Sequence, residues 1–244
     1  MSNLDFGAWR PLLLHGLWVT FYITVLGAAV ALVLAFALGL AGRSRHLLVR
    51  GVVRILVEFF RGTSLLVQLF WIYYALPQVT GWYSLSQSGS LAAVAALGLN
   101  FGAYGSEIVR GSINAVPKAQ FEGATALNFT GLQRMRLVII PQAIPLMIPP
   151  FGNMLIQLLK SSPLVALVAV LDIYYQANQY WEQEDHPAFI FGLLLVVYFV
   201  LAYAGTLAIR VLERQAQRRV GREMAPGTLR RLTFRTKGEG ATGA

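Results

Sequence analysis

The chain has no cysteine and only three histidines, His15, His46 and His186. The lack of cysteine excludes disulfide bonds and thiolate metal sites, and the histidines are too scattered along the sequence to suggest a metal cluster. The sequence also lacks a G-x-x-x-x-G-K-[ST] phosphate-binding loop and any credible nucleophile–base pattern. We therefore expect no catalytic site, no metal site and no cofactor bound by this chain.

Charged residues are absent from long stretches of the chain. Four runs contain no Asp, Glu, Lys or Arg: 11–42, 62–106, 137–159 and 187–209. Roughly 20 apolar residues cross a bilayer, so the second run is long enough for more than one crossing. Because 56% of the 244 residues are hydrophobic, the composition indicates an integral membrane protein.

These runs predict an all-α fold with five transmembrane helices. The predicted helices cover about 14–41, 52–77, 90–111, 139–168 and 188–212. The fourth helix carries four prolines near its start and Pro163 near its end, which favours kinks or a break. The predicted organisation is an external segment 1–13, a transmembrane domain 14–220 with a long loop at about 112–138, and a disordered basic tail 221–244.

Lys and Arg are concentrated in alternate connections. The connections 78–89 and 169–187 contain none, whereas basic residues flank the first connection, the long loop and the start of the tail. Because cytoplasmic loops are enriched in Lys and Arg, five crossings place the N-terminus outside and the C-terminus in the cytoplasm. The net charge of +9 lies beside membrane headgroups, so we expect lipid contact and no nucleic-acid binding.

The long polar loop carries the most specific pattern. Pro117 can start a helix without losing an intrahelical hydrogen bond, and residues 120–122 are predicted to form the first turn. Asn128 is one of the few non-glycine residues that tolerate a left-handed helix stop. We expect a compact helical knob with an exposed Phe121 that a partner could grip. The candidate docking residues are Pro117, Gln120, Phe121, Glu122, Gly123, Ala124, Leu127, Asn128 and Pro141.

The loop resembles the cytoplasmic loop of the membrane-spanning subunits of ABC importers. Its pattern there is EAA, three residues, Gly, nine residues and I-x-L-P, and residues 122–141 keep every spacing. Gly123 replaces the first alanine, Asn128 replaces the glycine, and two aliphatic residues are exchanged within 138–141. The resemblance implies that this loop is the coupling helix that docks on a cytoplasmic ATPase.

Three other segments resemble the polar amino-acid branch of the same family, which includes histidine, glutamine and arginine permeases. Residues 60–68 are close to its RGTPLLVQ signature, 104–111 to AY-x-x-E-I-x-R-G, and 159–164 to LK-[SD]-[ST]-S-L. The resemblance covers roughly 12–212 and implies the type I importer fold and import of a polar amino acid or a similar zwitterion, including compatible solutes of the ectoine and hydroxyectoine kind. The implied partners are a cytoplasmic ATPase dimer that binds the ATP, a second permease copy or paralogue, and a periplasmic or lipid-anchored substrate-binding protein.

Ionisable groups inside a spanning segment are costly and therefore candidates for function. Glu58 and Arg61 are three residues apart on the second predicted helix and could pair, and Gln68 lies two turns further along the same face. This stripe could line a path for a zwitterion, or the pair could be a structural salt bridge. Lys160, with Ser161 and Ser162, could face the path or extend to the interface. Glu107 and Arg110 are more simply an ion pair beside the long loop.

Two other classes of function remain open at this point. An ion-coupled secondary transporter would explain the charges inside the membrane, although it would not explain the patterned loop, and five helices are few for inverted repeats. A non-transporting membrane scaffold or sensor would leave Glu58, Arg61 and Lys160 without a role. Neighbouring genes for an ATPase and a secreted binding protein would favour the importer.

Overall fold

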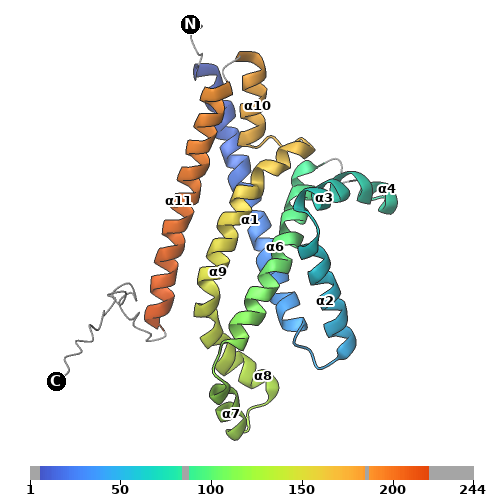
Figure 1. Ribbon diagram of the computed structural model, residues 1–244, viewed down its shortest axis with the longest axis vertical. Helices are drawn as coiled ribbons and strands as arrows, with labels where there is room; N and C mark the ends of the chain where they lie inside the picture. Colours follow the sequence, from blue (N-terminus) through green and yellow to red (C-terminus); the bar gives the residue numbers. More distant parts are fainter. Residues whose placement is uncertain (1–5, 84–87, 185–186, 220–244) are drawn as a thin grey trace, which may run out of the picture.

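The computed structural model describes residues 6–83, 88–184 and 187–219, and every regular element in these ranges is helical (Figure 1). In chain order the elements are α1 (Phe6–Ala41), α2 (Leu47–Gly62), α3 (Leu65–Phe70), η1 (Trp71–Ala75), α4 (Leu76–Thr80), α6 (Gly89–Asn114), α7 (Lys118–Ala126), α8 (Gly131–Gln133), η2 (Arg134–Ile139), α9 (Ile140–Ser161), η3 (Ser162–Val168), α10 (Ile173–Glu184) and α11 (Pro187–Arg219). The predicted tail 221–244 and the first five residues lie outside the described residues.

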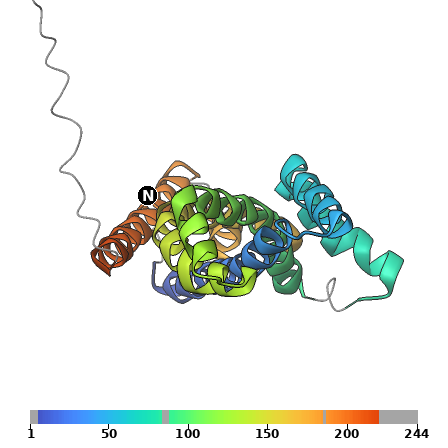
Figure 2. The same cartoon turned by 90° about the horizontal axis from the view of Figure 1, so that it is seen from below.

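Four segments are long and apolar enough to cross a membrane. They are Arg10–Ala41, Gly89–Asn114, Gly131–Val168 and Ala188–Gln215, and a bent pair of helices, 47–62 with 65–80, makes up to five spans. The all-α membrane fold is therefore confirmed. In Figure 1 these spans follow the long axis, with α7 and α8 at one end and α10 at the other, beside the start of α1. Seen from below, α2 and α4 lie on one side of the bundle and α11 on the other (Figure 2).

The second predicted helix, 52–77, is wrong as a single straight span. The chain bends by 105° between α2 and α3, because Thr63 and Ser64 are both extended, with ψ of 153° and 134°. The Thr63 hydroxyl donates to the Phe59 carbonyl oxygen and satisfies one acceptor at the end of α2. The segment from α3 to α4 consequently runs sideways from the bundle (Figure 1).

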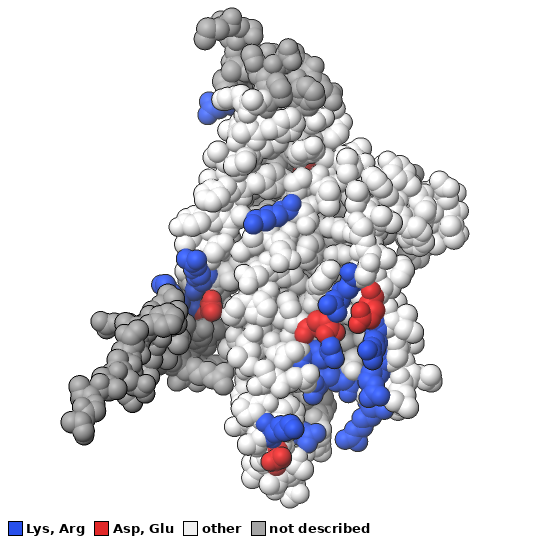
Figure 3. Space-filling model, viewed as in Figure 1, with Lys and Arg blue, Asp and Glu red and all other residues white. Residues whose placement is uncertain are grey.

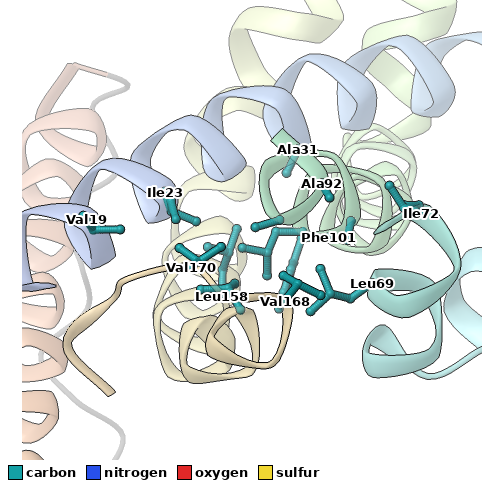
Figure 4. Packing of buried hydrophobic residues seen from close by; sticks show 14 of the residues in the cluster. Val19, Ile23, Ala31, Leu69, Ile72, Ala92, Phe101, Leu158, Val168 and Val170 are labelled. Atoms are coloured by element: carbon teal, nitrogen blue, oxygen red, sulfur yellow. The ribbon is translucent and has the colours of Figure 1, made fainter. Parts of the chain in front are cut away.

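Close contact between α1 and α6 organises the core. Gly98, Gly102 and Gly105 lie along α6 at the spacing that lets two membrane helices approach closely. A Cβ on Gly102 would stand 2.7 Å from Cβ of Leu34, so the backbones are too close for a side chain there. Around this contact, buried residues of α1, α3, α6, α9 and η3 form one cluster, shown in Figure 4. Its labelled members include Ile23, Leu69, Phe101, Leu158 and Val168.

Two predicted boundaries needed correction. The helix α1 begins at Phe6 rather than near residue 14, and the connection 169–187, predicted as a loop, contains the helix α10. The prolines of the fourth span do not break it apart. Residues 131–168 form one long helical segment that changes from π-helix to α-helix beside Pro141 and to 3-10 helix beside Pro163.

Candidate functional site

The loop between α6 and α9 contains the short helix α7, which lies at one tip of the molecule and has defined caps at both ends (Figure 1). Pro117 is the N-cap of α7, as expected, but the first turn is 118–121, so Glu122 lies in the second turn. At the other end the Asn128 amide donates to the Thr125 carbonyl oxygen at 2.9 Å, and the Phe129 amide donates to the Ala124 carbonyl oxygen at 3.1 Å. Asn128 has φ of 58°. These bonds form a Schellman motif, and the predicted left-handed stop is confirmed.

Side chains tie α7 to the spans that follow it. Phe121 is half-buried against a cluster that includes Val109, Ile139 and Met147, so the prediction of an exposed Phe121 was wrong. Phe121 lies three residues before the buried Ala124, so both side chains are on the face of α7 that points toward the bundle. Gln142 Nε2 donates to Gln120 Oε1 at 3.0 Å, and Arg134 Nη1 donates to Thr125 Oγ1 at 2.8 Å. These contacts join α7 to η2 and α9.

The outer face of this loop is available to a partner. Glu122 and Gly123 are exposed, and a Cβ on Gly123 would meet no atom within 4 Å. Leu127 is 70% exposed and Leu132 is 78% exposed, so the loop also presents two large apolar side chains. Pro141 is exposed in the first turn of α9. The loop therefore presents a small apolar surface together with the carboxylate of Glu122 on α7.

The bend between α2 and α3 is held by Gln68, which is almost completely buried. Gln68 Nε2 donates to the Phe60 carbonyl oxygen at 2.8 Å and to Thr63 Oγ1 at 2.6 Å. Asn100 Nδ2 of α6 donates to Gln68 Oε1 at 3.2 Å and to the Phe60 carbonyl oxygen at 3.0 Å. The backbone acceptors that the bend exposes are thus satisfied by two amide side chains inside the membrane.

The predicted stripe of Glu58, Arg61 and Gln68 on one helix face is wrong, because the bend turns Gln68 away. Among the described residues Arg61 forms no ion pair with Glu58. Its guanidinium carbon lies 5.4 Å from the centre of the Tyr104 ring, a cation–π contact. The Tyr104 hydroxyl donates to the Arg61 carbonyl oxygen at 3.2 Å. Glu107 and Arg110 form the expected ion pair.

A hollow of about 470 Å³ lies beside the bend. It is lined by side chains of α3, α6 and α9 and of the 63–64 turn: Thr63, Ser64, Leu65, Asn100, Phe101, Tyr104, Gln157, Lys160 and Ser161. Lys160 and Ser161 were predicted to belong to such a site. Ser162 does not line the hollow, since it is fully buried with its hydroxyl 3.5 Å from that of Tyr198.

Sequence reasoning missed Thr63, Asn100, Tyr104 and Gln157. A signal was present for Asn100, because an amide side chain in an apolar span needs a hydrogen-bond partner. Glu58 lies apart from the hollow, in a second cleft together with Arg54 and Arg110. The structure thus brings Lys160 and Ser161 to the bend that Gln68 holds, and separates Glu58 and Ser162 from them.

Asp172, between the third and fourth straight spans, is fully buried. Its Oδ1 accepts a hydrogen bond from the Tyr175 amide at 2.8 Å, and its Oδ2 has no partner among the described residues. Burial raises the pKa of this carboxyl from 3.8 to about 7. The backbone hydrogen bonds at the start of α10 favour the ionised form and oppose this shift, so burial is the dominant cause.

Because the folded state holds the Asp172 proton more tightly than the unfolded chain, the free energy of unfolding should fall as pH rises from about 4 to about 7. The loss should be on the order of a few kcal/mol at most. Asp172→Asn should flatten this dependence. Melting temperatures of the purified protein and of this variant between pH 5 and pH 8 measure it, and an equal slope in both would contradict the assignment.

Comparison with known proteins agrees with this geometry. The family described as binding-protein-dependent transport system inner membrane component matches residues 31–218. A probable amino-acid ABC transporter permease of Sinorhizobium fredii is 41% identical over 207 residues, covering 84% of this chain and 87% of its own. The arginine transport system permease of Bacillus subtilis is 36% identical over 219 residues, covering 87% and 97%.

Solved structures show the same fold. The crystal structure of an amino acid ABC transporter with histidines is 31% identical and superposes with a TM-score of 0.80, covering 88% of this chain and 99% of its own. A methionine ABC transporter in an inward-facing conformation, 20% identical, has a TM-score of 0.73 and supports the fold alone. The fold is that of a type I ABC importer permease. This chain belongs to the family of inner membrane components of binding-protein-dependent transport systems and is a multi-pass permease of the inner membrane.

Proposed function

We propose that this permease moves a polar amino acid, or a similar small zwitterion such as an ectoine-type compatible solute, into the cell with energy from a separate ATPase. The observation that carries this proposal is α7, a helix ended by a Schellman motif and tied to α9, with Glu122 and Gly123 exposed. The sequence has no phosphate-binding loop of its own. ATP is bound and hydrolysed by the partner, and the permease performs no chemical reaction.

The orientation follows from the distribution of basic residues. With the N-terminus outside, α7 and the basic turn between α1 and α2 face the cytoplasm, and α10 faces the side of the substrate-binding protein. A second permease copy or paralogue completes the pathway, because alternating access requires two halves that move against each other. The exposed apolar side chains of the spans leave ample surface for that partner and for lipid.

The hollow beside the bend is the proposed substrate path. Its Lys160 ammonium can attract a carboxylate, while the Ser64 and Ser161 hydroxyls can accept hydrogen bonds from an ammonium or a polar side chain. Gln68 and Asn100 position the bend rather than contact substrate, since their amide groups already hold the Phe60 carbonyl oxygen. Asn100 contributes part of the wall.

Uptake by proteoliposomes containing the permease pair, the ATPase and the binding protein tests this site. Lys160→Met should raise the substrate concentration needed for half-maximal uptake by about tenfold or more, because a charge-assisted hydrogen bond is lost. Lys160→Arg keeps the charge and should retain most of the activity. Unchanged uptake by Lys160→Met would remove Lys160 from the path. Uptake driven by an ion gradient without ATP would instead support a secondary transporter.

A further inference from the structure

A second cleft, of about 390 Å³, separates α2 from the lower end of α6. Arg50, Arg54 and Glu58 of α2 and Arg110 of α6 line the cleft, together with Gly42 and Leu47. Figure 3 shows charged side chains gathered over this part of the molecule, whereas the upper part of the same face is nearly free of them. The proposed substrate path does not use this cleft.

Positive charge in the cleft exceeds what the neighbouring acids neutralise. Arg110 is paired with Glu107, and Glu58 is the only acid that lines the cleft among the described residues. Arg50 and Arg54 form no ion pair with any described residue. Just outside the lining, Arg43 is half-buried with Nη1 donating to Asn114 Oδ1. Burial, and then repulsion by Arg110, lower the pKa of Arg43, so a further positive charge crowds the same corner.

The position of the cleft suits a lipid, because it lies at the end of a membrane span and beside an apolar helix surface. Gly42, which lines the cleft, directly follows the end of the first span at Ala41, so the cleft lies at one end of a membrane-spanning segment. The same helix α2 exposes a continuous set of apolar side chains along its outer side: Leu48, Val52, Ile55 and Phe59. Acyl chains can cover this surface while the headgroup enters the cleft.

We propose that the cleft between α2 and α6 binds the phosphate of an anionic phospholipid, with Arg50 and Arg54 as its principal partners. Arginine donates two parallel hydrogen bonds to phosphate oxygens, and basic pockets between membrane helices are suited to such headgroups. Glu58, which also lines the cleft, disfavours a second phosphate. A bound lipid would fix α2 against α6 next to the bend at 63–64.

Binding to the purified full-length permease in mild detergent tests the proposal. Native mass spectrometry should show that phosphatidylglycerol binds roughly tenfold to thirtyfold more tightly than phosphatidylcholine with the same acyl chains. Arg50→Gln/Arg54→Gln should lose this preference. Arg45→Gln, an exposed arginine of the preceding turn that does not line the cleft, should retain it, as should the charge-preserving Arg50→Lys/Arg54→Lys.

Three results would overturn the proposal. They are equal binding of the two lipids by the wild-type chain, an undiminished preference in Arg50→Gln/Arg54→Gln, and complete competition by inorganic phosphate at concentrations similar to those of the lipid. The last result would assign the cleft to a soluble phosphate compound. If Arg50→Gln/Arg54→Gln does not fold, the single variants Arg50→Gln and Arg54→Gln should each reduce the preference, and an undiminished preference in both would overturn the proposal. None of these measurements involves the ATPase or the transported substrate.

Discussion

Gly123→Trp should abolish ATP-driven uptake although the permease still folds and inserts in the membrane. Position 123 is exposed, and a side chain there meets no atom of the chain within 4 Å, so the variant should be as stable as the wild type. An indole on the outer face of α7 would hold the partner several ångströms away. If α7 and the ATPase cannot touch, ATP binding and hydrolysis cannot change the relative free energies of the inward-facing and outward-facing states of the permease.

Glu122→Lys should weaken the same contact by reversing the one carboxylate on α7, with a smaller loss of uptake than Gly123→Trp. The measurements are co-purification of the ATPase and uptake by reconstituted vesicles. Gly192→Trp, also at an exposed glycine with open space but on α11, is the matched control and should retain both. Full uptake by Gly123→Trp with the ATPase still attached would contradict the role of α7.

Gly102→Leu should prevent accumulation of folded permease. The new Cβ would lie 2.7 Å from Cβ of Leu34 and 3.3 Å from the Ala31 carbonyl oxygen. Since neither atom can move without its backbone, α1 and α6 would have to separate along the most extensive helix contact in the fold. Overpacking of this kind costs about 1–3 kcal/mol or more, and the displaced helices lose further contacts.

The yield of monodisperse protein in size-exclusion chromatography and its melting temperature measure this effect. Gly192→Leu introduces the same side chain into open space and should behave as the wild type. Leu34→Gly combined with Gly102→Leu should recover part of the yield, because it exchanges the small residue across the contact. A melting temperature of Gly102→Leu equal to that of the wild type would disprove the close approach of α1 and α6.

Features encoded within a few residues were predictable from the sequence. The helix start at Pro117 and the stop at Asn128 depend on local backbone preferences, and both occur in the structure. The four straight spans follow from the charge-free runs. The bend at Thr63 and Ser64 was not predictable, because it lies within an unbroken apolar run and is held by Asn100, 36 residues beyond Ser64 on another helix.

Tertiary contacts also explain the other differences. Phe121 was expected to be exposed because it lies in a polar loop, but the loop folds back and the ring packs against α6, η2 and α9. Lys160 could be recognised as unusual from its apolar surroundings. Its position beside Thr63, Asn100 and Tyr104 depends on three segments that meet only in the folded bundle.

Cross-linking from a single introduced cysteine tests most directly that α7 is the contact with the ATPase. Since the chain has no cysteine, Gly123→Cys supplies the only thiol of the permease. A short bifunctional reagent applied to membranes that contain the complete transporter should join this thiol to the ATPase and stop uptake. Gln78→Cys, exposed on α4, which projects sideways from the bundle far from α7, should give no such product. The opposite result, an ATPase adduct from Gln78→Cys and none from Gly123→Cys, would contradict both the docking surface and the orientation.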